Sequence, residues 1–525
     1  MDMDRRRFLA GSALLGAGLP AMRCARAAAD PGSPARRRAL HLLNRLGYGP
    51  RPGDLDRVLA MGVDGFLAAQ LEPGRLAKPP DLARRLAGLA TLRLNPAQLF
   101  ETYGPPALRR TPGEKPSPEE RGAARLRARV ILDEARAARL WRAVDGPRQL
   151  QSVMTEFWFN HFNVFAGKGL DHLWIGSFEA EAIRPHALGR FRDLLGATAR
   201  HPAMLVYLDN WRNTAPGSPA AHGPARGLNE NYAREVMELH TLGVDGGYTQ
   251  ADVVALARIF TGWGLPLARM RASGAVASGD GSFFRFDAQR HDYGAKRFLG
   301  RRIAGSGLAE GEEALDLLAG SPATARHIAY QIAQYFVADT PDPALVETLA
   351  QRFATTGGAI AEMLRALVAS RQFWNPVAIG GKFKTPYQYV LSTVRLAGVP
   401  LLDTRPLAAA LARLGMPLYG CQTPDGYNQA GVAWLNPDAM EKRLAFAMAL
   451  ASGRLPLDRP PPEAEAAAAF DGRPLQSEPS PPLDAARLAA AYGGGFSART
   501  REAVAAAPPR LQAAPILGSP ELMYR

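Results

Sequence analysis

The chain has few cysteines and no long hydrophobic run beyond its N-terminus. Its 525 residues include two cysteines, Cys24 and Cys421, so a set of internal disulfides cannot hold the fold together. After the N-terminal segment no window of eighteen residues is both apolar and uncharged, which argues against a transmembrane helix in the rest of the chain. We therefore expect a soluble mature protein that is stabilised by packing.

Several motifs that define well-known chemistry are missing as well. The sequence contains no H-E-x-x-H, C-x-x-C, G-x-S-x-G or P-loop motif, and no haem, flavin or iron–sulfur signature. The stretch "VDGGYTQADV" (244–253) lacks the alternating oxygen ligands of a calcium loop. Thr249 and Asp252 within it instead predict a capping box that opens a helix.

The chain is strongly basic. The formal net charge is +14, and only seven of the basic residues are lysines. Such a surface favours acidic partners, among which an envelope polymer is the candidate. No dense Lys/Arg run is interleaved with aromatic residues, so we expect no nucleic-acid partner.

The N-terminus is typical of an export signal. Arg5 and Arg6 precede a weakly apolar run, Phe8–Met22, and Ala27 and Ala29 offer an A-x-A cleavage site. This arrangement predicts a twin-arginine signal peptide over residues 1–29 and a periplasmic or secreted mature protein. Because that pathway exports folded proteins, often after cofactor insertion, it also favours a bound cofactor, for which a divalent metal ion is our candidate.

Helical periodicity dominates the remaining chain. Ala39, Leu42, Leu43 and Leu46 follow the i, i+3, i+4, i+7 spacing, and similar stretches recur almost to the C-terminus. Strand signals are clearest at 281–300, where the apolar runs 283–286 and 297–299 flank a polar turn. We predict an all-α protein, a multi-helix globular body with one small β-hairpin.

Composition suggests where this body ends. Residues 30–455 form one predicted helical domain. The Pro- and Ala-rich stretch 456–484 is a predicted flexible linker, and 485–525 is a predicted C-terminal helical segment that packs back on the main domain. A second stretch, "RTPGEKPSPEERG" (110–122), has the same flexible composition.

The strongest chemical lead is "GLNENYAREVMELHTLGV", residues 227–244. On an α-helical wheel Asn231, Glu235 and Glu238 share one side with Arg234, whereas His240 lies roughly opposite Glu238. Two carboxylates at i, i+3 could share a hard cation or act as acid and base. Alternatively, this face is solvated, with Arg234 paired to the acids one turn before and after it.

A second cluster is "MTEFWFNHFNVFAGKG", residues 154–169, which is aromatic on nearly every side and should be buried. Asn160 and His161 within it need partners, because a buried unsatisfied polar group costs about 1–3 kcal/mol. Either they belong to an internal hydrogen-bond network, or they line the edge of a cleft shared with Glu235 and Glu238.

A third candidate is "RHDYGAK", which places His291 and Asp292 on the turn of the predicted hairpin. Loops carry functional residues more often than their share of the chain. The alternative is an ordinary surface turn.

Five blocks of the chain resemble one bacterial family. They are "HLLNRLGYGP", "FWFNHFNVF", "LNENYAREVMELHTLGV" with "YTQADVVALARIFTGW", "FDAQRHDYGAKRFLG" and "KFKTPYQYV". In this order they are similar to the exported family catalogued as domain of unknown function (DUF) 1800, from about residue 38 to the C-terminus. The resemblance implies an export signal, a largely helical fold and a neighbouring protein of the DUF 1501 family. It supplies no established catalytic residues.

Two hypotheses follow. In the first, the protein is a periplasmic hydrolase with a helix-lined cleft, in which Glu235 and Glu238 are acid and base or cation ligands. The residues expected to assist them are Asn160, His161, Asn231, Arg234, His240, His291 and Asp292, with His161 as a further catalytic candidate. In the second, the protein is a non-catalytic envelope component that binds a polymer or assists a DUF 1501-type partner.

Overall fold

The structure of the chain is a computed structural model. It describes residues 33–105, 117–221, 227–266, 281–460 and 480–525. The predicted signal peptide, residues 1–29, lies outside the described residues. So do residues 461–479 of the predicted linker and residues 110–116 of the second flexible stretch.

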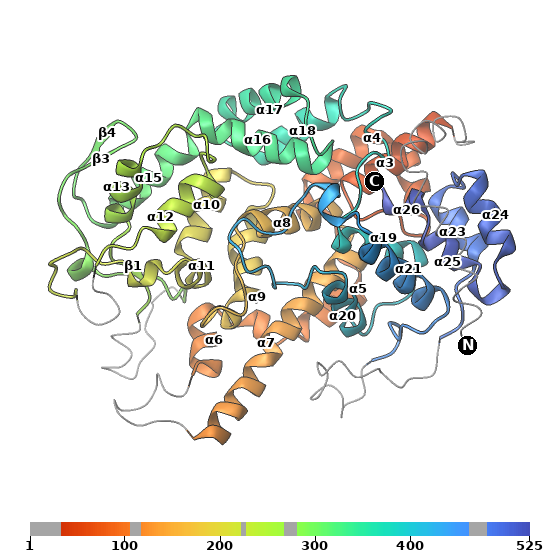
Figure 1. Cartoon of the computed structure of the whole chain (residues 1–525), viewed down its shortest axis with the longest axis horizontal. Coiled ribbons are helices and arrows are strands. Elements are labelled where there is room, and N and C mark those ends of the chain that lie inside the picture. The colour runs from red at the N-terminus through yellow and green to blue at the C-terminus, as the bar shows by residue number, and fades with distance from the viewer. Residues whose placement is uncertain (1–32, 106–116, 222–226, 267–280, 461–479) are drawn as a thin grey trace.

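Helices predominate in the described chain, which confirms the predicted fold class (Figure 1). The first half contains α3 (Pro34–Arg45), α4 (Asp54–Leu71), α5 (Pro80–Ala87), α6 (Pro96–Tyr103), α7 (Pro118–Asp145), α8 (Gln149–His161), α9 (Ile175–Ser177), α10 (Phe191–Arg200), α11 (Pro202–Tyr207), α12 (Asn231–Glu235) and α13 (Gln250–Ile259). The second half contains α15 (Leu308–Ala319), α16 (Pro322–Phe336), α17 (Pro343–Thr355), α18 (Ile360–Ala369), α19 (Pro386–Ala397), α20 (Arg405–Arg413), α21 (Pro437–Ala451), α23 (Ala485–Tyr492), α24 (Ala498–Ala506), α25 (Ala513–Leu517) and α26 (Pro520–Met523).

Two stretches are π-helical, η6 (Phe178–Ile183) and η9 (Val236–His240). Short 3-10 turns lie at Pro73–Arg75, Thr91–Arg93, Asp171–Leu173, Arg184–His186, Asn210–Arg212, Ala288–Arg290, Gly431–Trp434 and Pro509–Leu511. None of the described helices combines the length and the apolar character that crossing a membrane requires.

Local sequence explains where many helices begin. The predicted capping box of α13 is present, since the Thr249 side chain accepts from the Asp252 backbone and Asp252 accepts from the Thr249 backbone. Helix α19 begins in the same way at Thr385 with Gln388, and Pro386 occupies its first position. These caps satisfy backbone N–H groups that have no partner inside the helix.

The strands form two short antiparallel pairs. Strand β1 (Trp263–Gly264) pairs with β2 (Arg285–Phe286), and β3 (Lys296–Phe298) pairs with β4 (Arg301–Ile303). The predicted hairpin region is therefore β-structured, but its two apolar runs do not pair with each other. The second run folds back on itself because Leu299 and Gly300 both adopt positive φ angles, 46° and 78°, as a tight two-residue turn requires.

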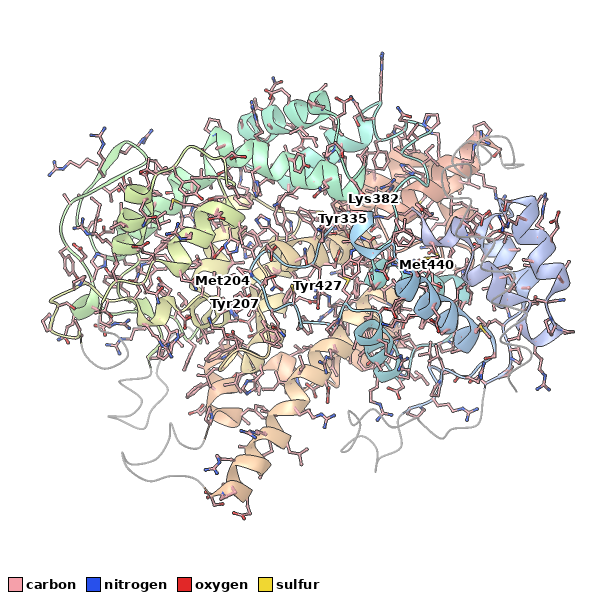
Figure 2. All side chains as sticks on the ribbon, in the orientation of Figure 1. Met204, Tyr207, Tyr335, Lys382, Tyr427 and Met440 are labelled. Carbon is pink, nitrogen blue, oxygen red and sulfur yellow. The ribbon has the colours of Figure 1, made fainter. Side chains whose placement is uncertain are left out.

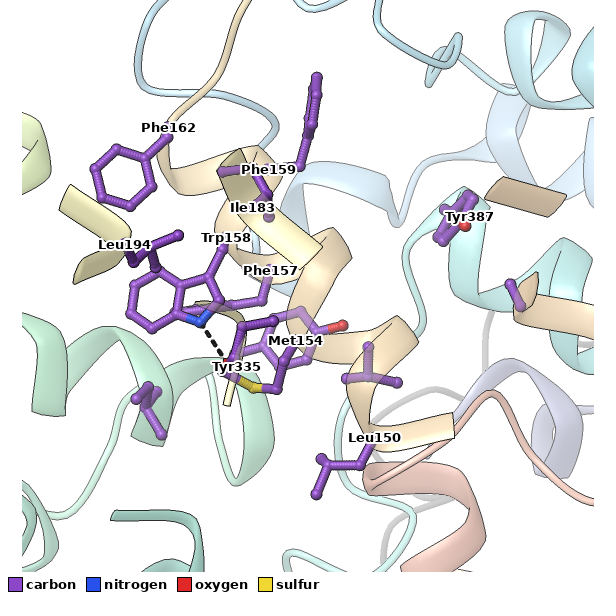
Figure 3. Close-up of a cluster of buried hydrophobic side chains, with 14 of the residues drawn as sticks. Leu150, Met154, Phe157, Trp158, Phe159, Phe162, Ile183, Leu194, Tyr335 and Tyr387 are labelled. Atoms are coloured by element: carbon purple, nitrogen blue, oxygen red, sulfur yellow. Dashed lines mark hydrogen bonds between the residues drawn. The ribbon is translucent and has the colours of Figure 1, made fainter. Parts of the chain in front are cut away.

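Helix α8 lies at the centre of the hydrophobic core, as its aromatic sequence predicts. Figure 3 shows Trp158 and Phe157 from α8 packed near Tyr335 of α16. The ring centroids of Phe157 and Tyr335 are 5.3 Å apart, and the indole nitrogen of Trp158 donates to the Ala187 carbonyl at 3.1 Å. A rigid, buried α8 gives the polar side chains on the same helix fixed positions.

The C-terminal helices pack on the body of the protein. Helices α23 and α26 contact α19, and α25 contacts α21. The backbone of Arg525 exchanges two hydrogen bonds with Lys382, at 3.2 Å and 2.8 Å, just before α19. This end of the chain therefore lies beside the segment that leads into the core.

Candidate functional site

The segment that carries the acid pair is not one continuous α-helix. Helix α12 ends at Glu235, and the π-helix η9 follows from Val236 to His240. The hydroxyl of Thr241 donates to the Val236 carbonyl at 2.6 Å, and the Gly243 N–H donates to the Met237 carbonyl at 3.1 Å. The prediction of a single α-helix is thus wrong after Glu235, because these bonds compete with the α-helical ladder.

The two predicted acids are half-buried and are not neutralised by Arg234. The guanidinium of Arg234 bonds to Glu230 at 3.2 Å and to the Gln250 side chain at 3.0 Å. The predicted Glu230–Arg234 pair is therefore confirmed, and within the described ranges no ion pair joins Arg234 to Glu238. Glu238 instead accepts a long hydrogen bond, 3.4 Å, from the Tyr248 hydroxyl.

The surroundings of Glu235 favour its neutral form. Burial raises the pKa of Glu235, the negative charges of Glu238 and Asp425 raise it further, and Arg234 partly opposes them. Asp425 reaches this region on an exposed loop. A neighbouring carboxylate in a half-buried setting makes the ionisation of Glu235 less favourable, which suits Glu235 to carry a proton.

Asn231 anchors the segment that carries the acids, and Tyr207 lies in their electrostatic surroundings. The Asn231 amide donates to the Leu208 carbonyl at 3.2 Å, which ties the start of α12 to the end of α11. The hydroxyl of Tyr207, a residue labelled in Figure 2, donates to the Gln422 carbonyl at 2.9 Å. Burial raises the pKa of Tyr207, and Glu235 contributes to this shift, which places Tyr207 in the electrostatic environment of the acids.

The structure brings His161 and His240 together, with ring centroids 5.9 Å apart. The two ring nitrogens of His161 lie 2.6 Å from Gln331 Oε1 and 3.1 Å from the His240 carbonyl oxygen. Burial, followed by the charge of His327, lowers the pKa of His161 to about 3. His161 is thus a buried core residue with a polar atom beside each ring nitrogen, and neither nitrogen contacts Glu235 or Glu238.

No sequence pattern had singled out His327 as a candidate site residue. Its Nε2 lies 3.2 Å from the Leu239 carbonyl oxygen and 3.0 Å from Gln331 Nε2. His327 and Gln331 are one helical turn apart on α16, and this polar pair on an otherwise apolar helix face was the available signal.

Asn160 contacts a distant loop. Its amide accepts from the Tyr427 N–H at 2.8 Å and donates to the Tyr427 carbonyl at 2.9 Å. The neighbouring Asn163 donates to the carbonyls of Cys421 and Thr423, at 3.1 Å and 2.8 Å. Both asparagines of the FNHFN motif therefore hold one surface segment against α8.

His291 and Asp292 belong to a separate buried network. His291 Nε2 lies 2.6 Å from Glu310 Oε1, and Lys296 donates to Glu310 Oε2 at 2.6 Å, with all three side chains fully buried. Asp292 pairs with Arg258 at 2.6 Å. The interpretation of a surface turn is wrong for His291, because Glu310, which the sequence did not single out, draws it into the core.

Two cavities in the described part of the chain are lined by other residues. A shallow surface depression of about 470 Å³ lies between α17 and α18, beside Arg352 and Arg365. A small cavity of about 20 Å³ lies next to α8 and is lined by Glu156 and Asn160 among others. Neither is lined by Glu235 or Glu238.

No group of three or more His, Cys, Asp or Glu side chains is arranged to hold a metal ion in the ranges that the structure describes. Glu235 and Glu238 would supply two carboxylates to a cation. A hard divalent ion takes six or more oxygen ligands, so water or substrate would have to complete the shell.

The fold and the site define a predominantly helical protein with a half-buried acid pair at a π-helical turn. The comparison with curated proteins and the comparison with solved structures gave no match. A family described as "Protein of unknown function (DUF1800)" matches residues 41–524, and the chain belongs to this family.

Proposed function

We propose that this protein is an exported hydrolase in which Glu235 donates a proton and Glu238 serves as the base. The proposal rests on one observation. Glu235 and Glu238 are half-buried and lie one turn apart, while the adjacent guanidinium of Arg234 bonds to Glu230. The twin-arginine sequence at Arg5 and Arg6 supports export to the periplasm.

The roles follow from the two environments. Hydrolysis needs a proton for the leaving group and a base that activates water. Glu235, whose pKa is raised by burial and by neighbouring acids, holds its proton to higher pH and suits the first role. Glu238, which accepts a hydrogen bond from Tyr248, suits the second. The net charge of +14 favours an anionic envelope polymer as the substrate.

The same pair could act through a divalent ion. Two adjacent carboxylates would then be its protein ligands, and water or substrate would fill the other positions. Elemental analysis of protein purified after native export separates this version from metal-free acid–base catalysis. A stoichiometric metal that disappears in Glu238→Gln would support it, and a metal-free active protein would exclude it.

The test of catalysis uses Glu235→Gln and Glu238→Gln, with Glu441→Gln as the control because Glu441 is an exposed acid on α21. Activity is measured as the release of soluble fragments from isolated envelopes, together with chromogenic esters, phosphoesters and glycosides. General acid–base groups contribute roughly 10²–10⁴-fold, so either site variant should lose at least about 100-fold. Full activity in both variants would contradict the assignment.

A second candidate is a non-catalytic envelope protein that binds a polymer or assists a DUF 1501-type partner. It is favoured by the high positive charge and by the position of the two cavities away from the acid pair. Under this function the protein co-sediments with envelopes or co-purifies with the partner, and Glu235→Gln binds as the wild type does.

A further inference from the structure

Glu156 has a buried carboxyl group, and one of its two oxygens has no hydrogen-bond partner among the described residues. Its residue is 2% exposed, and Oε2 accepts a hydrogen bond of 2.5 Å from the Tyr335 hydroxyl. Oε1 is buried and has no hydrogen-bond partner among the residues that the structure describes. A buried polar atom without a partner is rare in native proteins and calls for a ligand such as water.

A small cavity lies beside Glu156. Glu156 lines the cavity of about 20 Å³ together with Arg139, Tyr387 and Tyr419. A cavity of roughly 10–15 Å³ already admits one water molecule. The volume therefore fits one water and excludes a sugar or an amino acid while the cavity keeps this size.

The charges around the cavity favour a neutral ligand. Arg139 lies 3.3 Å from Glu179, and this carboxylate also pairs with Arg184 at 2.8 Å and accepts from the Tyr419 hydroxyl at 3.0 Å, so Arg139 is already ion-paired. Burial raises the pKa of Glu156, which keeps this carboxyl group protonated to higher pH. A protonated carboxyl, a tyrosine and a paired arginine suit water better than an ion.

A surface segment contributes one residue to the cavity wall. Residues 421–427 follow Tyr419 and contain no helix or strand, and Tyr427 forms part of the cavity wall. Their backbone is held by Asn160, Asn163 and Tyr207 through the side-chain hydrogen bonds given above. Gly426 lies directly on Asn160, since a Cβ atom there would come within 2.3 Å of the Asn160 carbonyl oxygen.

No helix or strand ladder holds this segment. Gln422, Thr423 and Asp425 are exposed, and the hydrogen bonds to the segment come from Asn160 of α8, Asn163 just after it and Tyr207 of α11, while the Tyr427 hydroxyl donates to the Pro417 carbonyl at 2.8 Å. Breaking them exchanges protein partners for water and leaves the ladders of both helices intact. Positive φ angles at Tyr419, 61°, and Gly426, 73°, mark sharp bends near its two ends.

We propose that the cavity is a water-binding site with Glu156 Oε1 as its principal protein ligand, and that residues 421–427 are the lid that controls exchange with solvent. The segment shares Asp425 and Tyr207 with the surroundings of Glu235. Its tests need no catalytic activity, so they can fail or succeed independently of the proposed hydrolase.

The water is tested by a high-resolution crystal structure of the full chain. We expect an ordered water within about 3.2 Å of Glu156 Oε1, and its absence in Glu156→Leu. An empty cavity in the wild type, or an unchanged water in Glu156→Leu, would overturn the proposed site. The wild-type structure decides the matter even if Glu156→Leu fails to fold.

The lid is tested through Cys421, which is 8% exposed and begins the segment. In a Cys24→Ser background it is the single thiol, so its rate of reaction with dithionitrobenzoate measures opening. Asn163→Ala removes two bonds to the lid and should raise this rate at least 10-fold. Tyr207→Phe removes one bond and should raise it less. Asn375→Ala, which removes a bond within a separate turn, should leave it unchanged.

Hydrogen exchange separates lid opening from general unfolding. In Asn163→Ala and Tyr207→Phe we expect faster exchange confined to about residues 419–429, with an unchanged melting temperature. A thiol reaction that keeps the wild-type rate in both variants would refute the lid. So would a rate that rises only in step with global unfolding, measured by its denaturant dependence.

Discussion

His161 lies with its Nε2 atom 3.1 Å from the backbone carbonyl oxygen of His240, which joins the central helix α8 to the end of the π-helical turn. The two residues are 79 positions apart in the chain. Since Glu238 is two residues before His240, this contact fixes the turn on which the acid pair is built. His161 thus supports the proposed site from inside the core, without contact with either acid.

The first prediction concerns acid stability. The folded-state pKa of His161, about 3, lies below the ordinary value of 6.5, so the unfolded state binds a proton first as the pH falls. Stability from this residue is present above pH 6.5 and is lost as the pH falls toward 3, with a loss of roughly 3 kcal/mol by pH 4.

Denaturant unfolding at pH 7 and pH 4 measures this loss of stability, which should be smaller in His161→Gln. Equal losses in wild type and variant would contradict it, and His186→Gln, at a half-buried residue, is the control.

The second prediction tests the charge that surrounds Glu235. Asp425 is one of the charges that raise the pKa of Glu235, so Asp425→Asn should lower that pKa. Because the proposed donor must be protonated, the alkaline fall in activity should move to lower pH while the maximal rate is retained. The pH–rate profile is the measurement, with Asp64→Asn, an exposed acid on α4, as the control. An unshifted alkaline limb would remove Glu235 from the role of donor.

The third prediction concerns the buried network of His291. Glu310→Gln takes the negative charge away from Lys296, whose side chain is fully buried. Breaking a buried ion pair in this way costs about 3–5 kcal/mol, because it leaves an uncompensated charge. Urea unfolding should show this loss. Glu313→Gln, at an exposed position on the same helix, should change stability by less than about 0.5 kcal/mol. A small effect of Glu310→Gln would show that Lys296 finds another partner.

The fourth prediction tests the π-helical turn. Thr241→Val keeps the side-chain shape but removes the hydroxyl that donates to the Val236 carbonyl. We expect a destabilisation of about 1–3 kcal/mol and a shift of Glu238 that lowers activity. Thermal unfolding and the activity assay check the two effects, with Thr355→Val, an exposed threonine with a similar bond on α17, as the control. Wild-type stability in Thr241→Val would mean that the hydroxyl does not hold the turn.

The central position of α8 could be predicted because its aromatic residues leave no polar face. The hydrogen-bond partners of its polar residues could not be predicted. Asn160 bonds to Tyr427, 267 residues away, and Glu156 to Tyr335, 179 residues away. No local pattern encodes such partners, since they depend on how distant helices pack.

The sequence by itself determined the helical class, the family and the local signals, such as the cap at Thr249 and the left-handed Gly243 after the turn. These features depend on contacts between residues that are close together in the sequence. Only the tertiary structure decided that β2 pairs with Trp263, that η9 is a π-helix and that His291 is buried against Glu310. In each case local preferences allow several outcomes, and burial with hydrogen bonds to remote segments selects one of them.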